Sequence, residues 1–161
     1  MSGLALRLAF GLALVWPALG MIGAPKGLAI APVDEAILFP ACLLAFAGAA
    51  FALYAQAYMG GSWRVGTVAG QLGPLVVTGP FAISRNPVFV GQILLLTGLG
   101  ACFPSITELA AAAIAVAAII FQAHREEAAL RLQHRASYLD YARRTPRWLG
   151  LRSAFGRRGC D

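Results

Sequence analysis

The sequence predicts an all-α, polytopic integral membrane protein from its composition and its four long apolar stretches. Of the 161 residues, 59% are hydrophobic and only 12% are charged, whereas charged residues make up about 25% of an ordinary soluble domain. The mean hydropathy is +0.71. A helix needs about 20 apolar residues to cross a bilayer, and the apolar stretches cover residues 4–22, 37–58, 88–103 and 106–123. We therefore expect a single domain over residues 1–161 with about four transmembrane helices.

The first stretch, residues 4–22, has two interpretations. Its apolar run and the small residues Ala18 and Gly20 are also compatible with a cleaved secretory signal peptide. Arg7 is the one positive charge before that run, which is little for a signal peptide. We therefore favour a retained first span.

The next three stretches follow from their length and their boundaries. Residues 37–58 are long enough to span a bilayer on their own. Residues 88–103 and 106–123 are short and are separated by Pro104 and Ser105. Because proline cannot continue the helix before it, we expect these two segments to form a tight C-terminal helical hairpin.

The charges predict which loops face the cytoplasm. Cytoplasmic loops next to membrane spans are enriched in Lys and Arg. With four spans and both termini inside, Lys26 is the one basic residue of thirteen that falls outside. We expect a bacterial inner-membrane protein with both termini cytoplasmic. The net charge of +6 then reflects topology, and we expect no nucleic-acid partner.

The three cysteines, Cys42, Cys102 and Cys160, show neither paired spacing nor the spacing of metal ligands. Two of them fall inside predicted spans, where buried thiols are common. We expect no disulfide framework and no metal site.

A long loop, residues 59–87, connects the second span to the hairpin and ends on Ser84-Arg85-Asn86-Pro87. Pro87 suits the first position of a helix, and Asn86 suits the N-cap, with its side-chain oxygen accepting a backbone N–H. The simplest interpretation is a topology-determining arginine beside a helix start. The alternative is anion binding, because Arg85 could hold an anion together with the helix dipole.

The tail after the hairpin predicts a cytosolic amphipathic helix over residues 124–144. Spacings of three and four residues place a carboxylate, an imidazole and two phenols on one face, namely Glu127, His134, Tyr138 and Tyr141. One interpretation is a helix lying in the membrane interface. That interpretation does not explain the adjacent pair Glu126 and Glu127, because carboxylates are unfavourable beside an anionic leaflet unless they are paired or bind a ligand.

These motifs, in this order, resemble those of the integral-membrane methyltransferases typified by isoprenylcysteine carboxyl methyltransferase and the phospholipid N-methyltransferases. The family pattern is R-H-P-x-Y-x-G, a helical hairpin, E-E, and L-x-x-x-F-G-x-x-Y-x-x-Y. The resemblance covers about residues 60–149. The chain departs from the pattern at Asn86 in place of His, at Phe89 in place of Tyr, and at His134-Arg135 in place of Phe-Gly.

The resemblance implies an S-adenosylmethionine-dependent methyltransferase acting at the membrane. Its substrate would be a lipid or a lipophilic small molecule with a carboxylate, amine or thiol acceptor. The implied catalytic residues are Glu127 and Arg131. Those implied to bind the cofactor are Arg85, Asn86, Pro87, Phe89, Gly91, His124, Glu126, Glu127 and Tyr138.

The two adjacent carboxylates should have unequal roles, because neighbouring residues on a helix point about 100° apart. Glu127 shares a face with Tyr138 and Tyr141, so we predict that it contacts the cofactor. We predict that Glu126 chiefly pairs with tail or loop arginines.

Two other classes of function stay open at this point. A steroid-reductase-like membrane enzyme would bind NADPH at a similar cytosolic opening. A non-enzymatic membrane adaptor would bind neither nucleotide. The sequence does not identify the methyl acceptor or the oligomeric state.

Overall fold

A computed structural model describes residues 11, 15, 34–60 and 74–150, and within these ranges every regular element is a helix. The elements are α2 (Glu35–Met59), the short 3₁₀ helix η2 (Gly79–Ala82), α3 (Pro87–Cys102) and α4 (Ile106–Arg144). The predicted all-α class is confirmed for this part of the chain. The first predicted span, apart from residues 11 and 15, and residues 61–73 of the predicted loop lie outside the described residues.

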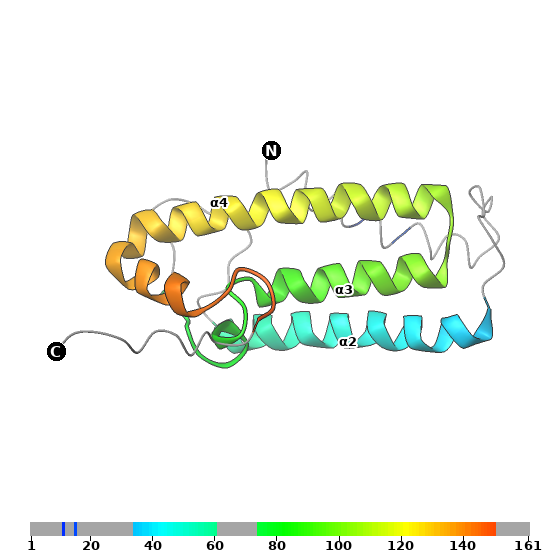
Figure 1. Ribbon diagram of the computed structural model, residues 1–161, viewed down its shortest axis with the longest axis horizontal. Coiled ribbons are helices and arrows are strands. Elements are labelled where there is room, and N and C mark those ends of the chain that lie inside the picture. The colour runs from blue at the N-terminus through cyan, green and yellow to red at the C-terminus, as the bar shows by residue number, and fades with distance from the viewer. Residues whose placement is uncertain (1–10, 12–14, 16–33, 61–73, 151–161) are drawn as a thin grey trace.

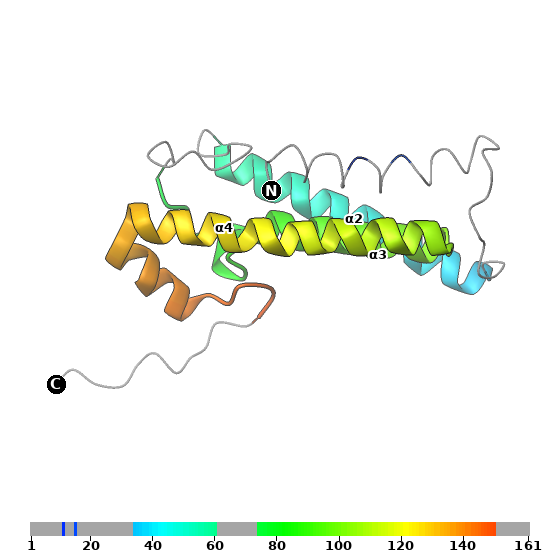
Figure 2. The same ribbon diagram turned by 90° about the horizontal axis from the view of Figure 1, so that it is seen from above.

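The three long helices lie along one another and alternate in direction (Figure 1). Contacts between α2 and α3 pair residues early in one helix with residues late in the other: Gly98 meets Ala45, and Gly91 meets Ala52. The chain then reverses at Phe103–Ser105 and returns as α4, as the predicted hairpin required. In the view from above, α4 lies over α3 for most of the length of α3 (Figure 2).

Small residues bring α2 and α3 into backbone contact. A Cβ atom added to Gly98 would lie 2.5 Å from the backbone nitrogen of Ala45, and one added to Gly91 would lie 2.6 Å from that of Ala52. Real Cβ atoms do not approach backbone this closely, so both positions require glycine at this helix separation. Such small-residue contacts are typical of helices that pack in membranes.

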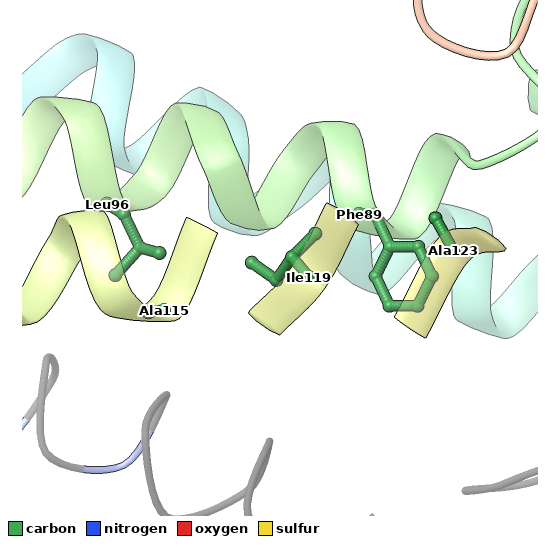
Figure 3. Packing of buried hydrophobic residues seen from close by; sticks show 5 residues of the cluster. All are labelled: Phe89, Leu96, Ala115, Ile119 and Ala123. Carbon is green, nitrogen blue, oxygen red and sulfur yellow. The ribbon is translucent and has the colours of Figure 1, made fainter. Parts of the chain in front are cut away.

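The core between α3 and α4 is a row of buried apolar side chains (Figure 3). From α3 it contains Phe89 and Leu96, and from α4 it contains Ala115, Ile119 and Ala123. Alanines on α4 leave room for the larger side chains of α3, so the two helices interdigitate. This row fixes the start of α3 against the middle of α4, where the polar residues described below begin.

Two helices, α2 and α4, are long and apolar enough to cross a membrane, whereas α3 is apolar but has only 16 residues. The outer face of α2 carries large exposed side chains: Phe39 is 75% exposed, Phe46 74% and Leu53 64%. Exposed apolar surface of this extent is a property of proteins that contact lipid or a partner. The chain is therefore suited to association with a membrane.

The tail helix differs from its prediction. Residues 124–144 do not form a separate helix, because α4 runs without interruption from the apolar segment into the charged one. No proline or glycine occurs between Ile106 and Arg144, so nothing in the local sequence ends the helix near residue 124. The direction changes instead at Arg135, whose φ of 41° and ψ of −114° are not helical. Beyond it, the last turns fold back toward the start of α3 (Figure 1).

Candidate functional site

A buried polar network lies at the end of the bundle where three segments meet. These are the turn before α3, the second half of α4, and the chain that follows α4 and returns to that turn (Figure 1). The backbone N–H of Arg85 donates to the carbonyl of Pro146 at 2.9 Å. This backbone hydrogen bond places the side chains of both segments against α4.

Glu127 is the centre of the network. Its side chain is only 4% exposed, and its two oxygens accept four hydrogen bonds. Arg85 donates from Nη1 to Oε2 at 2.8 Å, and Asn86 donates from Nδ2 to Oε1 at 2.9 Å. Arg147 donates from Nε to Oε1 at 2.9 Å and from Nη2 to Oε2 at 3.2 Å. A carboxylate with this many donors is well compensated for its burial.

Asn86 and Ser84 hold the returning chain by its backbone. Asn86 Nδ2 and Ser84 Oγ each donate to the carbonyl of Arg147 at 3.2 Å. Asn86 does occupy the N-cap of α3, with Pro87 following it as predicted, but its side chain makes no capping hydrogen bond. The predicted capping by its side-chain oxygen is wrong, because the amide group is used on Glu127 and Arg147.

Two buried tyrosines complete the network from the last turns of α4. Tyr141 donates its hydroxyl hydrogen to the carbonyl of Phe81 at 2.7 Å. Tyr138 is fully buried, and its hydroxyl oxygen accepts from Arg85 Nη1 at 3.4 Å. The helix break at Arg135 turns both rings back onto the polypeptide before α3, and their planes meet at 74°.

Burial, hydrogen bonds and neighbouring charges shift the pKa of Glu127, Tyr138 and Tyr141. Burial raises the pKa of Glu127, but hydrogen bonds from Arg147 and Asn86 and the charges of Arg85 and Arg147 outweigh it, so the net shift is downward. Burial raises the pKa of Tyr138 and of Tyr141. Glu127 is thus held as a carboxylate and both tyrosines as neutral phenols. Two guanidinium groups against one carboxylate leave the network with an excess positive charge.

The structure gives Glu127 the arginine pairing that was predicted for Glu126. Glu127 pairs with Arg85 and Arg147, and its predicted contact with a cofactor stays a prediction. Glu126 accepts a hydrogen bond from Gln122 Nε2 at 2.9 Å, one turn earlier on the same helix. Glu127 and the two tyrosines are all buried, but the helix break at Arg135 lies between them, so they are not on one continuous helix face. The arginine pairing of Glu127 was not predicted, because it depends on the arginine of the α3 turn and the arginine of the returning chain both reaching it.

The remaining predicted site residues lie in the network, in the packed interior or, for Arg131, on the exposed surface of α4. His124 belongs to the network, where its Nε2 lies 2.9 Å from Arg147 Nη1. Phe89 is part of the core between α3 and α4, and Gly91 lies against α2. Arg131 is exposed on α4, and its charge acts on Tyr138 from outside the network.

Arg147 and Ser84 belong to the network but were not among the predicted site residues. Arg147 was counted only among the cytoplasmic charges, and Ser84 only as part of a loop. Nothing in the local sequence distinguishes Arg147 from the other tail arginines, so only the return of the chain to α3 identifies it.

Comparison with known proteins gives the following relatives. The chain is 35% identical over 101 residues to the nickel-cobalt-cadmium resistance protein NccN of Alcaligenes xylosoxydans xylosoxydans, an alignment that covers 62% of this chain and 47% of that protein. It is 35% identical over 72 residues to the cobalt-zinc-cadmium resistance protein CzcN of Cupriavidus metallidurans, covering 45% of this chain and 33% of that one. The relatives are metal-resistance proteins. No family model and no solved structure matches the chain.

The chain spans about half the length of the first of these relatives and a third of the second. Their names nevertheless correct the functional interpretation of the sequence. The predicted S-adenosylmethionine-dependent methyltransferase, and the family resemblance on which it rested, are wrong, because both relatives are named for metal resistance. The names fit a steroid-reductase-like enzyme no better, and they do not favour a non-enzymatic adaptor. S-adenosylmethionine binding and a lipophilic substrate stay predictions from the sequence.

Proposed function

We propose that this chain takes part in bacterial resistance to divalent transition-metal ions, as a protein embedded in the inner membrane with both termini in the cytoplasm. The observation that carries the proposal is the 35% identity over 101 residues to the nickel-cobalt-cadmium resistance protein. Cobalt and cadmium occur in the names of both relatives. The apolar helices α2 and α4 support the membrane location.

The Glu127 network supports a specific role within this function. Its carboxylate is occupied by four donors, and its excess charge is positive, so it does not attract a metal cation in this conformation. It does join the α3 turn, α4 and the returning chain at one end of the bundle. We propose that the network stabilises one conformation of that end of the bundle, and that resistance depends on this conformation.

A tolerance assay tests the proposal. The full chain is expressed in a metal-sensitive bacterium, and the lowest inhibitory concentrations of nickel, cobalt, zinc and cadmium are measured against an empty vector. We expect tolerance to at least one of these ions to rise twofold or more, with no change toward a stress unrelated to metals. No gain for any of the four ions, with the chain detected in the membrane fraction, would contradict the proposal.

The network's role is tested by a matched pair of variants in the same assay. Glu127→Gln removes the charge that binds both arginines, whereas Glu126→Gln alters the adjacent residue, which accepts a hydrogen bond from Gln122. We expect the first variant to lose tolerance and the second to keep it, at equal abundance in the membrane. Equal metal tolerance with both variants would show that the network is not needed for the proposed function.

A further inference from the structure

Two cysteines from different helices lie together at the opposite end of the bundle. Cys42 is in the second turn of α2, and Cys102 is the last residue of α3. Their Sγ atoms are 3.4 Å apart, at hydrogen-bonding distance, and both thiols are free. The spacing of 60 residues gave no sign of this pair, which arises only because α2 and α3 run antiparallel.

The helices hold the two thiols in this position through their backbones. Gly98 lies one turn before Cys102, and its missing side chain lets α3 touch α2 at the backbone of Ala41 and Ala45. These two alanines flank Cys42 in the sequence. Because neither helix can move closer, and separation would break the contact at Gly98, the distance between the sulfurs is set before any ligand arrives.

That distance is close to the one a tetrahedral metal ion needs. With zinc–sulfur bonds of about 2.3 Å and a tetrahedral angle, two thiolate ligands lie about 3.8 Å apart, and a larger ion such as cadmium needs a somewhat wider pair. For zinc, the thiols therefore need to separate by only a few tenths of an ångström. Cys42 is exposed and Cys102 is buried, so the pair is open on the side of Cys42.

The chemistry of the complex also suits its surroundings. Each thiol loses one proton, each sulfur forms one bond to a divalent ion, and the product of two thiolates and one dication is neutral. A neutral complex is tolerated among apolar side chains, where an isolated charge is not. Thiolate ligands select soft ions. Among the described residues no third His, Cys, Asp or Glu completes a larger metal-binding group, so the two thiolates are the ligands that this part of the chain supplies.

We propose that Cys42 and Cys102 form a two-thiolate site for a soft divalent metal ion at the contact between α2 and α3. This site would bind an ion of the kind to which the proposed function confers resistance, so its role in the cell rests on that proposed function. The binding itself concerns this chain alone and is measured on purified protein. A failure of the binding test is therefore distinguishable from a failure of the tolerance test.

The test titrates cadmium chloride into the full chain, reduced and purified in detergent, with Cys160→Ser as the parent so that the third thiol is absent. We expect one cadmium ion per chain, a thiolate-to-cadmium absorption band in the ultraviolet, and release of two protons per ion. Cys42→Ser and Cys102→Ser should each weaken binding at least tenfold. Magnesium chloride should give none of these signals.

Three results would overturn the proposal. The first is cadmium binding by either serine variant with the affinity of the parent. The second is one ion for every two chains, which would place the thiols between molecules. The third is a reduced parent that does not bind cadmium but loses two mass units on mild oxidation, in which case the pair forms a disulfide instead. Circular dichroism of each variant confirms that the helices are intact.

Discussion

Arg147 binds both carboxylate oxygens of Glu127 with one edge of its guanidinium group, through Nε at 2.9 Å and Nη2 at 3.2 Å. The two residues are twenty positions apart, and the helix break at Arg135 lies between them. The contact therefore requires the chain to bend at that break, continue to Arg144 and return. It ties the segment after α4 to the same carboxylate that Arg85 binds from the start of α3.

The first prediction is that Glu127→Gln destabilises the folded protein strongly. Removing one partner of a buried ion pair leaves its cations uncompensated, at a cost of about 3 to 5 kcal/mol. The cost should fall toward the lower figure because the side chain of Arg147 is 34% exposed. Thermal unfolding in detergent, followed by circular dichroism, measures the change.

The control for that measurement is Glu126→Gln. Its hydrogen bond from Gln122 can be kept by an amide oxygen, so we expect a change below about 1 kcal/mol. Similar losses in the two variants would mean that Glu127 has no special structural role.

The second prediction concerns acid. The folded-state pKa of Glu127 lies below its ordinary value of 4.5, so the unfolded chain takes up this proton first as the pH falls. The stability contributed by Glu127 is fully present above pH 4.5 and is lost as the pH falls through the folded-state value. Glu127→Gln should unfold with a weaker dependence on pH below 4.5 than the parent. Parallel pH curves for the two proteins would contradict this.

The third prediction compares two glycines two residues apart on α3. A Cβ atom at Gly98 would lie 2.5 Å from backbone of α2, whereas one at Gly100 would meet only a side-chain atom of Leu109 at 3.6 Å. We expect Gly98→Ala to destabilise by about 1 to 3 kcal/mol through overpacking. Gly100→Ala should be neutral or stabilise by up to about 1 kcal/mol, because alanine favours helix. Thermal unfolding of both variants checks the contrast.

The fourth prediction separates the two buried tyrosines. Tyr141→Phe removes a 2.7 Å hydrogen bond and leaves the carbonyl of Phe81 without it, which should cost about 1 to 3 kcal/mol. Tyr138→Phe removes only a 3.4 Å contact with Arg85, whose Nη1 also binds Glu127. Its cost should be smaller. The unfolding midpoint of each variant is measured, and we expect the lower midpoint for Tyr141→Phe. A lower midpoint for Tyr138→Phe would contradict the prediction.

The fifth prediction is the topology proposed from the charges. A reporter fused after Asp161, or inserted near Gly70, should show cytoplasmic activity, because twelve of thirteen basic residues are then inside. A periplasmic signal at either point would overturn the four-span arrangement. The same fusion proteins, scored for periplasmic processing of the N-terminus, distinguish a retained first span from a cleaved signal peptide.

What the sequence determined by itself is local. The lengths of the apolar runs predicted α2 and α3 to within two residues at each end, because helix length in an apolar segment depends on nearby composition and on breakers such as Pro104. Pro87 at the start of α3 and the reversal at Phe103–Ser105 also follow from neighbouring residues. The helical repeat placed Glu127, Tyr138 and Tyr141 on one side of the tail, but the break at Arg135, which brings both tyrosines back to the start of α3, was not predicted.

What only the tertiary structure decided is which distant groups meet. Arg85 and Asn86 reach Glu127 across more than 40 positions, and Cys42 reaches Cys102 across 60. Such contacts depend on how each helix is rotated and how far it slides along its neighbour, which glycine contacts such as that of Gly98 with Ala45 determine. A sequence records the periodicity of a helix but not its rotation against another, so the partner of Glu127 could not be predicted.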